Sequence, residues 1–351
     1  MLEGIKVLSF THFLQGPAAV QMLADVGADV IKIEPPGGAF ERSWTGADAF
    51  IEGVSVFFLL GNRNQRSISL DLREEAAREI VWRLIREADV IVENYRPGVL
   101  DKMGFGYAQV HEVNPRLVYC SCTGYGSSGP YLKRPGQDLL LQAMSGMTLL
   151  SGDAESPPTP VGSAIVDQHA AALAAFGVVA ALQARERTGV GARIESNLLN
   201  AALDLQIEPF TYYMNKGPLW ARTHPPTGSR FHPAPYGVYK TRDGYIAMSL
   251  TPTQKLAGAL SCPALAEFTH PKGARASCSF VRSRFSPRCQ CDAAFDIGVD
   301  LLRCITQFRE HFAGMLSLFR RMATQTRRFA VIAHRMREQA HGAGFVMVEA
   351  F

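Results

Sequence analysis

The 351-residue sequence lacks the features that would indicate secretion, membrane insertion or disorder. Residues 1–6 contain neither a basic segment nor an apolar stretch, so no signal peptide is expected. The longest apolar run, residues 170–182, has 13 residues, whereas a membrane-spanning helix needs roughly 20. Apolar residues make up 47% of the chain, and glycine and proline are ordinary, which excludes a disordered protein. We expect a folded, cytoplasmic protein without a membrane partner.

Lysine is absent from residues 273–351, which hold 12 arginines, six acidic residues and four of the seven cysteines. Residues 1–272 hold 16 arginines, eight lysines and 26 acidic residues, so the positive net charge belongs to the last segment. Its cysteines lack the CxxC spacing of zinc sites, and no aromatic-basic motif suggests a nucleic-acid partner. We interpret residues 273–351 as a divergent, Arg- and Cys-rich tail that a frameshift near Lys272 would produce.

Apolar strand patterns alternate with amphipathic helix patterns over the first 200 residues. The predicted strands are residues 5–10, 29–33, 67–70, 89–92, 117–121 and 191–195. This alternation is typical of βαβ units, so we predict an α/β fold with a Rossmann-like, mostly parallel sheet in a large domain, residues 1–200.

A smaller α+β domain is expected after the large one. Residues 201–235 read as a helix followed by a proline-rich linker. Residues 237–249 predict a β-hairpin, because Asp243-Gly244 supplies residues suited to its turn. Residues 236–272 would therefore begin a second domain, which the divergent tail leaves incomplete.

A glycine-rich segment follows the predicted strand 117–121. Gly124, Tyr125 and Gly126 open a GxGxxG pattern. Pro130 follows at once, so no helix begins where a dinucleotide pyrophosphate would need one, and we expect no NAD. Two interpretations stay open: a loop that offers N–H groups to an acyl oxygen, or a plain tight turn.

Six segments of the sequence together resemble one known family. They are residues 4–36 (GIKVLSFTHFLQGPAAVQMLADVGADVIKIEPP), 61–72 (GNRNQRSISLDL), 88–104 (ADVIVENYRPGVLDKMG), 114–131 (NPRLVYCSCTGYGSSGPY), 135–146 (PGQDLLLQAMSG) and 161–171 (VGSAIVDQHAA). They are similar to the class III CoA-transferases, which include formyl-CoA and carnitine CoA-transferases and the α-methylacyl-CoA racemases. The resemblance extends to about Lys272, roughly three quarters of the chain.

The resemblance implies a reaction and an assembly. In the transferases one aspartate takes the acyl group from acyl-CoA and then carries CoA as an aspartyl thioester, and Asp167 stands at its position. The implied substrates are an acyl-CoA and a free carboxylic acid, with no metal required. The family also implies a homodimer of interlocked subunits.

Asp167 lies where an alanine-rich helix is predicted to begin, at about residues 167–186. A helix start favours a negative side chain by about 0.3–1 kcal/mol, and apolar surroundings would leave the carboxylate poorly hydrated and reactive. From the residues alone, an ordinary N-cap is the more common role of such an aspartate, and the family resemblance reverses that preference.

Gln137 and Asp138 distinguish the transferases from the racemases. The racemases resembled here have a histidine at the position of Gln137, and a glutamine cannot exchange protons near neutral pH. A racemase is therefore the alternative enzyme, and an inactive CoA-binding remnant is the alternative from another class. Asp138 matches an acidic position near the transferase active site, where it could orient other groups or cap its own helix.

The resemblance also implies residues that bind CoA. Three departures from the family pattern affect them: Gln15 replaces a small residue, Gln65 replaces a common lysine, and Pro35 stands where arginine can occur. For each arginine or lysine, a solvated surface charge is the alternative. The implied set is Leu14, Gln15, Asn62, Arg63, Asn64, Gln65, Asn94, Tyr95, Arg96 and Lys102.

Overall fold

The computed structural model describes residues 1–217, residue 222 and the segments 228–229, 231–232, 236–240, 245–249, 252–259 and 348–349. It divides into two compact units. The described part of the first comprises Met1–Ser145 and Val161–Leu205 with residues 348–349, and that of the second comprises Gly146–Pro160 and the described residues from Gln206 to Ala259. The domain limits expected from the sequence remain predictions. The tail of residues 273–351 lies outside the described residues, apart from 348–349.

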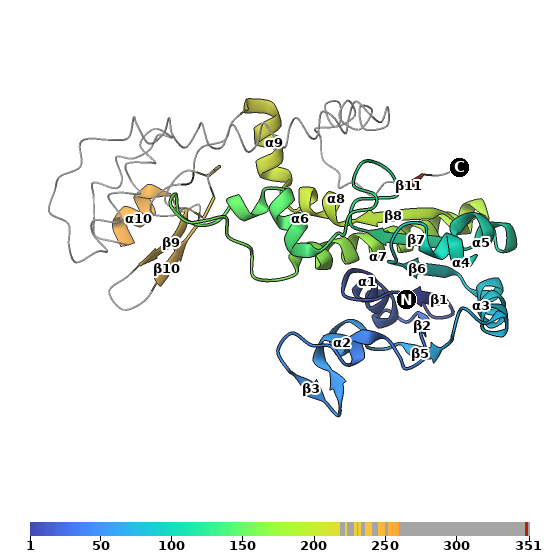
Figure 1. Ribbon diagram of the computed structural model, residues 1–351. Helices are drawn as coiled ribbons and strands as arrows, with labels where there is room; N and C mark the ends of the chain where they lie inside the picture. Colours follow the sequence, from blue (N-terminus) through green and yellow to red (C-terminus); the bar gives the residue numbers. More distant parts are fainter. Residues whose placement is uncertain are drawn as a thin grey trace. The chain divides into compact units, whose positions relative to one another are not determined.

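Six parallel strands form the sheet of the first unit, in the order β8-β7-β6-β1-β2-β5 (Figure 1). A short strand, β11, pairs antiparallel with β8. The predicted α/β fold with a mostly parallel sheet is confirmed. The bounds are β1 Lys6–Phe10, β2 Asp29–Glu34, β5 Arg66–Ser69, β6 Val90–Glu93, β7 Val118–Thr123, β8 Arg193–Asn197 and β11 Val348–Glu349.

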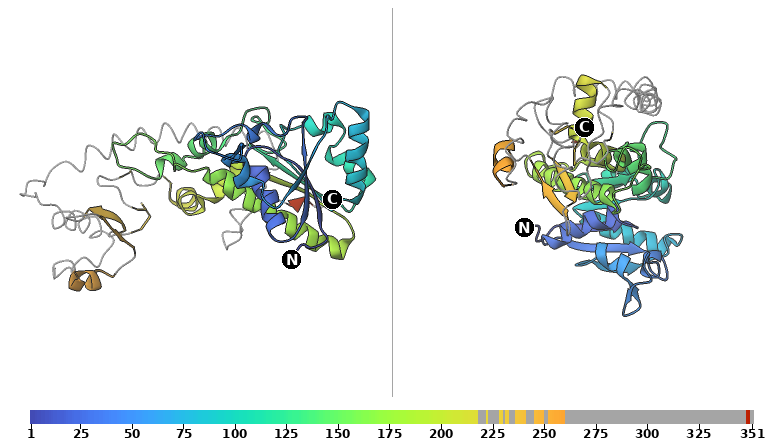
Figure 2. Two further views of the ribbon diagram at one scale, coloured as in Figure 1. Left: turned by 90° about the horizontal axis from the view of Figure 1, so that it is seen from below. Right: turned by 90° about the vertical axis from the view of Figure 1, so that its left-hand side faces the viewer.

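Alternate residues of the strands face two separate cores. Val90 and Val92 join a core with α1 (Gln15–Asp25) and α7 (Ile165–Thr188). Ile91, between them, joins a second core with α3 (Glu75–Glu87). Because strand side chains alternate between the two faces, each face receives its own helical layer, as the two views of Figure 2 show.

The remaining elements connect these layers or belong to the second unit, where β9 and β10 form the predicted antiparallel hairpin. The hairpin turn lies outside the described residues. The bounds are η1 Phe40–Arg42, β3 Phe50–Ile51, β4 Val54–Ser55, α2 Val56–Gly61, α4 Val99–Met103, α5 Tyr107–Val113, α6 Asp138–Met144, η2 Met147–Leu149, α8 Leu198–Asp204, α9 Ile207–Lys216, β9 Gly237–Lys240, β10 Tyr245–Met248 and α10 Thr253–Ala259.

α7 is the central helix of the first unit. It is the one helix among the described residues that is long and apolar enough to cross a membrane, but half of its apolar window is buried inside the fold. Ala171, Ala174 and Val178 pack in the same core as α1 and the sheet. α7 is therefore a core helix, and the cytoplasmic location remains a prediction.

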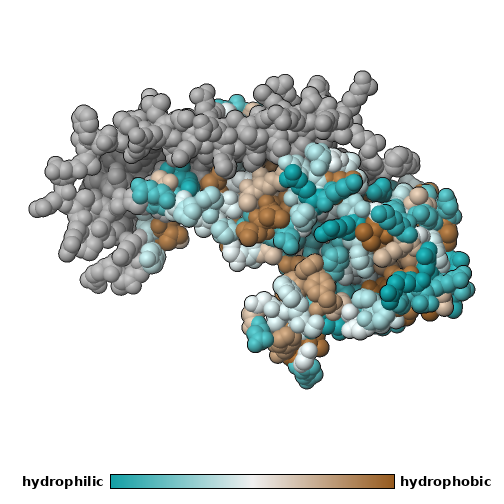
Figure 3. Space-filling view, viewed as in Figure 1, coloured by the Kyte–Doolittle hydropathy of each residue, from teal (hydrophilic) through white to brown (hydrophobic). Residues whose placement is uncertain are grey.

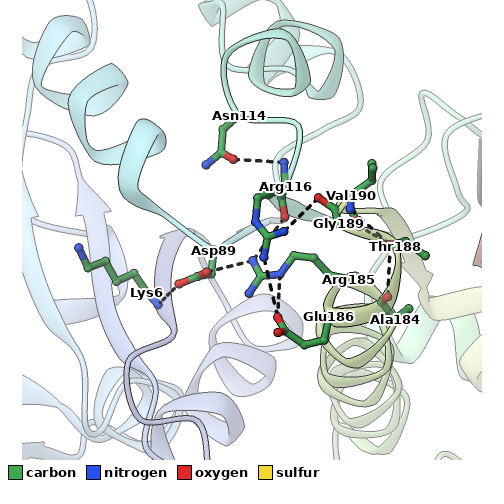
Figure 4. Close-up of polar contacts among 10 residues, drawn as sticks. All are labelled: Lys6, Asp89, Asn114, Arg116, Ala184, Arg185, Glu186, Thr188, Gly189 and Val190. Atoms are coloured by element: carbon green, nitrogen blue, oxygen red, sulfur yellow. Dashed lines mark hydrogen bonds and ion pairs between the residues drawn. The ribbon is translucent and has the colours of Figure 1, made fainter.

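A cluster of charged residues fixes the carboxyl end of α7 (Figure 4). The Arg185 side chain is 5% exposed, and its Nη1 lies 2.9 Å from Oδ1 of Asp89. The other oxygen of Asp89 accepts the backbone N–H of Lys6 at 2.9 Å. Gly189 ends the helix in the left-handed conformation, with φ 73°, which glycine adopts without steric cost.

Candidate active site

Asp167 is the third residue of α7, because the helix begins at Ile165, two residues earlier than expected. The N-cap residue is Ala164, which provides no side-chain bond. Asp167 is thus not the N-cap. Its side chain belongs to the first turn and is free for another role.

The carboxylate of Asp138 caps α7 in place of a residue from that helix. Asp138 Oδ2 accepts the backbone N–H of Val166 at 2.7 Å and that of Asp167 at 2.9 Å. Asp138 is the first residue of α6 and follows Gln137, the N-cap of α6, which also makes no side-chain cap bond. Of the two interpretations of Asp138, the structure supports orientation of another group. The group it orients is the backbone that carries Asp167.

Burial, and to a smaller extent the negative charge of Asp138, raise the pKa of the Asp167 carboxyl to about 7. Within the described residues, the Asp167 carboxylate has no hydrogen-bond donor and no ion-pair partner. The helix start alone would favour the anion, but loss of hydration is the larger effect here. Near neutral pH a substantial fraction of the Asp167 carboxyl groups is therefore ionised, and the ionised carboxylate is poorly solvated.

Gln142 is a part of this site that sequence reasoning missed. Its side chain is 2% exposed and lies one turn after Asp138 on α6. Its Nε2 donates to Asp138 Oδ1 at 2.5 Å. A glutamine four residues after an aspartate on an apolar helix was the available signal, since such residues share a helix face.

The glycine segment turns tightly after β7. The Gly126 N–H donates to Thr123 Oγ1 at 2.8 Å, and Gly124 O accepts from Leu199 N at 3.1 Å. A Cβ on Gly124 would lie 2.6 Å from the Gly136 Cα, so the two backbones touch. The N–H of Gly126 is therefore engaged within the turn. A role of Gly124 and Tyr125 in holding an acyl oxygen remains a prediction.

Leu14 ends a loop that leads into α1, whose first residue is Gln15, and the backbone of this loop is clamped by three side chains. Asn94 Oδ1 accepts His12 N at 2.8 Å, and its Nδ2 donates to His12 O at 2.8 Å. Buried Lys32 donates to Thr11 O at 2.7 Å, and buried Glu41 accepts the N–H of Phe13. Together these hydrogen bonds hold Phe13 at φ 58°, a backbone conformation that is unusual for a residue with a side chain. Asn94 thus fixes the loop that contains Leu14.

Gln15 connects this first loop to the start of α7. Its Nε2 lies 3.4 Å from Ser196 O at the end of β8, and Ser196 Oγ donates to Ala170 O at 2.8 Å. Parallel strands β1, β6, β7 and β8 all end at this edge of the sheet. Ligands of such sheets bind at the carboxyl edge. The start of α7, which carries Asp167, lies at that edge.

Aromatic residues surround the first loop. The Phe13 ring lies 4.9 Å from that of Phe40, and Trp44 lies 4.9 Å from Phe57 between ring centroids. Phe13, Phe40 and Trp44 are each almost half exposed. Figure 3 shows the apolar surface that covers this part of the molecule, over α2 and β3. The first loop therefore borders an apolar surface.

The other predicted CoA-binding residues fall into two groups. Arg96 and Lys102 are exposed, and the ring of Tyr95 lies 5.3 Å from that of His12. The structure brings Tyr95 to the first loop, whereas phosphate binding by Arg96 and Lys102 remains a prediction.

The second group, Asn62–Gln65, uses its side chains inside the fold. Arg63 and Asn64 both bind Asp25 at the end of α1. Asn62 donates to Phe58 O at 2.8 Å, and Gln65 to Gly61 O at 3.3 Å. These contacts fasten the segment along α1, and its role in CoA binding is still a prediction.

Metal ligands do not cluster in the described part of the chain, where no group of three or more His, Cys, Asp or Glu side chains could hold an ion. His169, two residues after Asp167, pairs instead with Asp204 on α8 at 2.6 Å.

A family model described as CoA-transferase family III matches residues 2–279. The chain belongs to this family. The resemblance seen in the sequence is confirmed. Acetyl-CoA:oxalate CoA-transferase of Acetobacter aceti is 38% identical over 244 residues, which are 69% of this chain and 61% of the relative. Succinyl-CoA:glutarate CoA-transferase of Mus musculus is 37% identical over 260 residues, 73% of this chain and 58% of the relative.

Solved structures agree with this membership. A CAIB/BAIF family protein from Brucella suis has 32% sequence identity and a TM-score of 0.71, and the match covers 87% of this chain and 81% of that one. The chain spans about three fifths of the length of the curated relatives described above. The family and fold are thus established from the greater part of the chain, and the activity of the whole protein is a proposal.

Proposed function

We propose that this family III member transfers coenzyme A from an acyl-CoA to a free carboxylic acid through Asp167. The observation that carries the proposal is the state of the Asp167 carboxyl. It is partly buried, lacks a cationic partner among the described residues and has a pKa near 7. Such a carboxylate is a stronger nucleophile than a fully hydrated one.

The proposed reaction begins with attack of an Asp167 carboxylate oxygen on the thioester carbonyl carbon. The C–S bond breaks, and a mixed anhydride and the CoA thiolate result. The thiolate then attacks the aspartyl carbonyl carbon and releases the donor acid as its carboxylate. Asp167 now carries CoA as a thioester, and no oxidant or ATP is consumed.

The second half runs the same steps with the acceptor acid. Its carboxylate attacks the aspartyl thioester and expels the thiolate, which forms a second mixed anhydride. The thiolate attacks the acceptor carbonyl carbon, the new acyl-CoA leaves, and the Asp167 carboxylate is regenerated. The names of the two relatives pair acyl-CoA donors with oxalate and glutarate. By analogy, the substrates proposed here are an acyl-CoA and a free acid, with a homodimer as the active assembly.

A racemase is less well supported, because it needs a second group that exchanges a proton. Gln137 stands at the start of α6 and has no acidic or basic side-chain atom near neutral pH. Incubation with acyl-CoA in deuterated water distinguishes the two reactions. Incorporation of deuterium at the α-carbon without transfer to added acids would support the racemase.

The direct test is mass spectrometry of the Asp167 peptide after incubation with acyl-CoA. We expect a mass increase on Asp167 that disappears when a free acid is added, and no increase in Asp167→Asn. Glu79→Gln removes an exposed carboxyl from α3 and serves as the matched control. Binding of CoA without any adduct or turnover would instead favour the inactive remnant.

A further inference from the structure

Gln142 is a buried amide within an otherwise apolar part of α6. Leu141 beside it is fully buried, and the Gln142 side chain is 2% exposed. A buried polar side chain is stabilising only when its donors and acceptors are satisfied. The contacts of Gln142 therefore show what the amide is used for.

All three contacts of the Gln142 amide lead to the site around Asp167. Its Nε2 donates to Asp138 Oδ1 at 2.5 Å and to Ser163 O at 3.0 Å. Its Oε1 accepts the N–H of Val161 at 3.0 Å. One amide thus fastens both the segment that enters α7 and the carboxylate that caps it.

The two oxygens of Asp138 have separate partners because of Gln142. Oδ1 takes the amide of Gln142, and Oδ2 takes the N–H groups of Val166 and Asp167. Without the amide, Oδ1 would be left without its donor. The carboxylate would then be free to rotate, and its hold on the Asp167 backbone would weaken.

We propose that Gln142 is a positioning residue, which keeps the Asp138 carboxylate oriented and thereby fixes the Asp167 nucleophile. This rests on the proposed role of Asp167. Gln142 itself touches no reacting atom and acts through Asp138. The nearby charge of Asp138 is one of the two causes of the raised pKa of Asp167.

The test uses two variants with opposite expected effects. Gln142→Met keeps the length of the side chain but removes the donor, so the Asp138 carboxylate is no longer held beside the start of α7 and Asp167 should titrate at lower pH. Gln142→Glu keeps the acceptor for Val161 and adds an acidic group beside Asp138, so Asp167 should titrate at higher pH. Each shift should be about half a pH unit or more.

The titration is read without turnover, from the pH dependence of carbodiimide modification of Asp167 in the full chain, followed by peptide mass spectrometry. Gln183→Met, at an exposed position of the same α7, is the matched control and should titrate like the wild type. In Gln142→Met, kcat should also fall about tenfold, which corresponds to about 1.4 kcal/mol, while KM for acyl-CoA stays within about twofold.

Identical Asp167 titrations in Gln142→Met, Gln142→Glu and Gln183→Met would overturn the proposal. So would shifts of the same sign in both Gln142 variants, because a general loss of packing would move them together. If the wild type transfers no CoA but the two titrations shift in opposite directions, the proposed function fails and the role of Gln142 stands.

Discussion

The two ends of α7 hold buried charge in opposite ways. At the carboxyl end, Arg185 lies 2.9 Å from Asp89, whose second oxygen also accepts a backbone N–H. At the amino end, Asp167 has no cation beside it among the described residues, and its neighbour Asp138 carries the same charge. The charge at the carboxyl end thus has an ion-pair partner, whereas the carboxylate at the amino end has none among the described residues.

The difference separates a structural site from a candidate reactive one. A buried charge held in an ion pair is not free to react, and removal of one partner is strongly destabilising because it leaves an uncompensated buried charge. An unpaired carboxylate is costly to ionise, and the cost is retained where chemistry requires it. The surrounding bonds of Asp138 and Gln142 hold this costly group in place. The predictions below test whether the two ends are as different as their contacts indicate.

The largest effect should follow from loss of the unpaired carboxyl. Asp167→Asn is expected to reduce CoA transfer by about 10³-fold or more, because an amide cannot form the anhydride. Initial rates with a fixed acyl-CoA and acid measure it. Transfer within about tenfold of wild type would contradict the role of Asp167 as nucleophile.

At the other end of α7, Arg185→Met should destabilise the fold without changing the chemistry. Asp89 is partly exposed, so the loss should be about 2–4 kcal/mol in the free energy of unfolding, measured by urea denaturation. Arg187→Met, at an exposed position two residues on, should change it by about 0.5 kcal/mol at most. An unchanged unfolding midpoint in Arg185→Met would show that this pair is dispensable.

Because the pKa of the Asp167 carboxyl is raised in the folded state, the free energy of unfolding should decrease as the pH rises. Between the ordinary value of 3.8 and about 7, folded Asp167 keeps a proton that the unfolded chain has released. Wild-type stability should therefore fall relative to Asp167→Asn as pH rises through this window, then level off. The difference should reach about 1–3 kcal/mol, allowing for partial exposure. A difference that grows as pH falls would have the wrong sign.

The smallest effect should come from removing only the charge of Asp138. In Asp138→Asn the amide oxygen can still accept the N–H groups of Val166 and Asp167, but the repulsion is lost. The pKa of Asp167 should fall and yet stay above 3.8, because burial is the larger cause of its shift. Carbodiimide titration of Asp167 measures this, and a rise in its midpoint would contradict the assignment.

Much of the fold could be predicted from the sequence because it depends on local patterns. The apolar runs gave the six parallel strands within a few residues, and the alanine-rich stretch gave α7. The start of α7 was placed two residues late, since nothing at Ala164 signals a cap. The start of α7 is capped by Asp138, which lies 27 residues before Ile165, and no local pattern reports such a pairing.

The individual site residues show the same division. The family resemblance identified Asp167, and the composition of the following residues placed it near the start of a helix. The hydrogen-bond partners of Asn94, Arg63 and Gln142 could not be predicted from the sequence, because each of these side chains bonds to a segment that is distant in the sequence. Residues expected to face a ligand can thus also serve to hold the site together.

The sequence by itself determined the mostly parallel α/β sheet and the presence of an aspartate at the start of a long apolar helix, because periodicity and composition encode local structure. The tertiary structure decided the state of that aspartate. Burial and the nearby charge of Asp138 arise only when α6 packs beside α7, and these two effects give the Asp167 carboxyl its raised pKa.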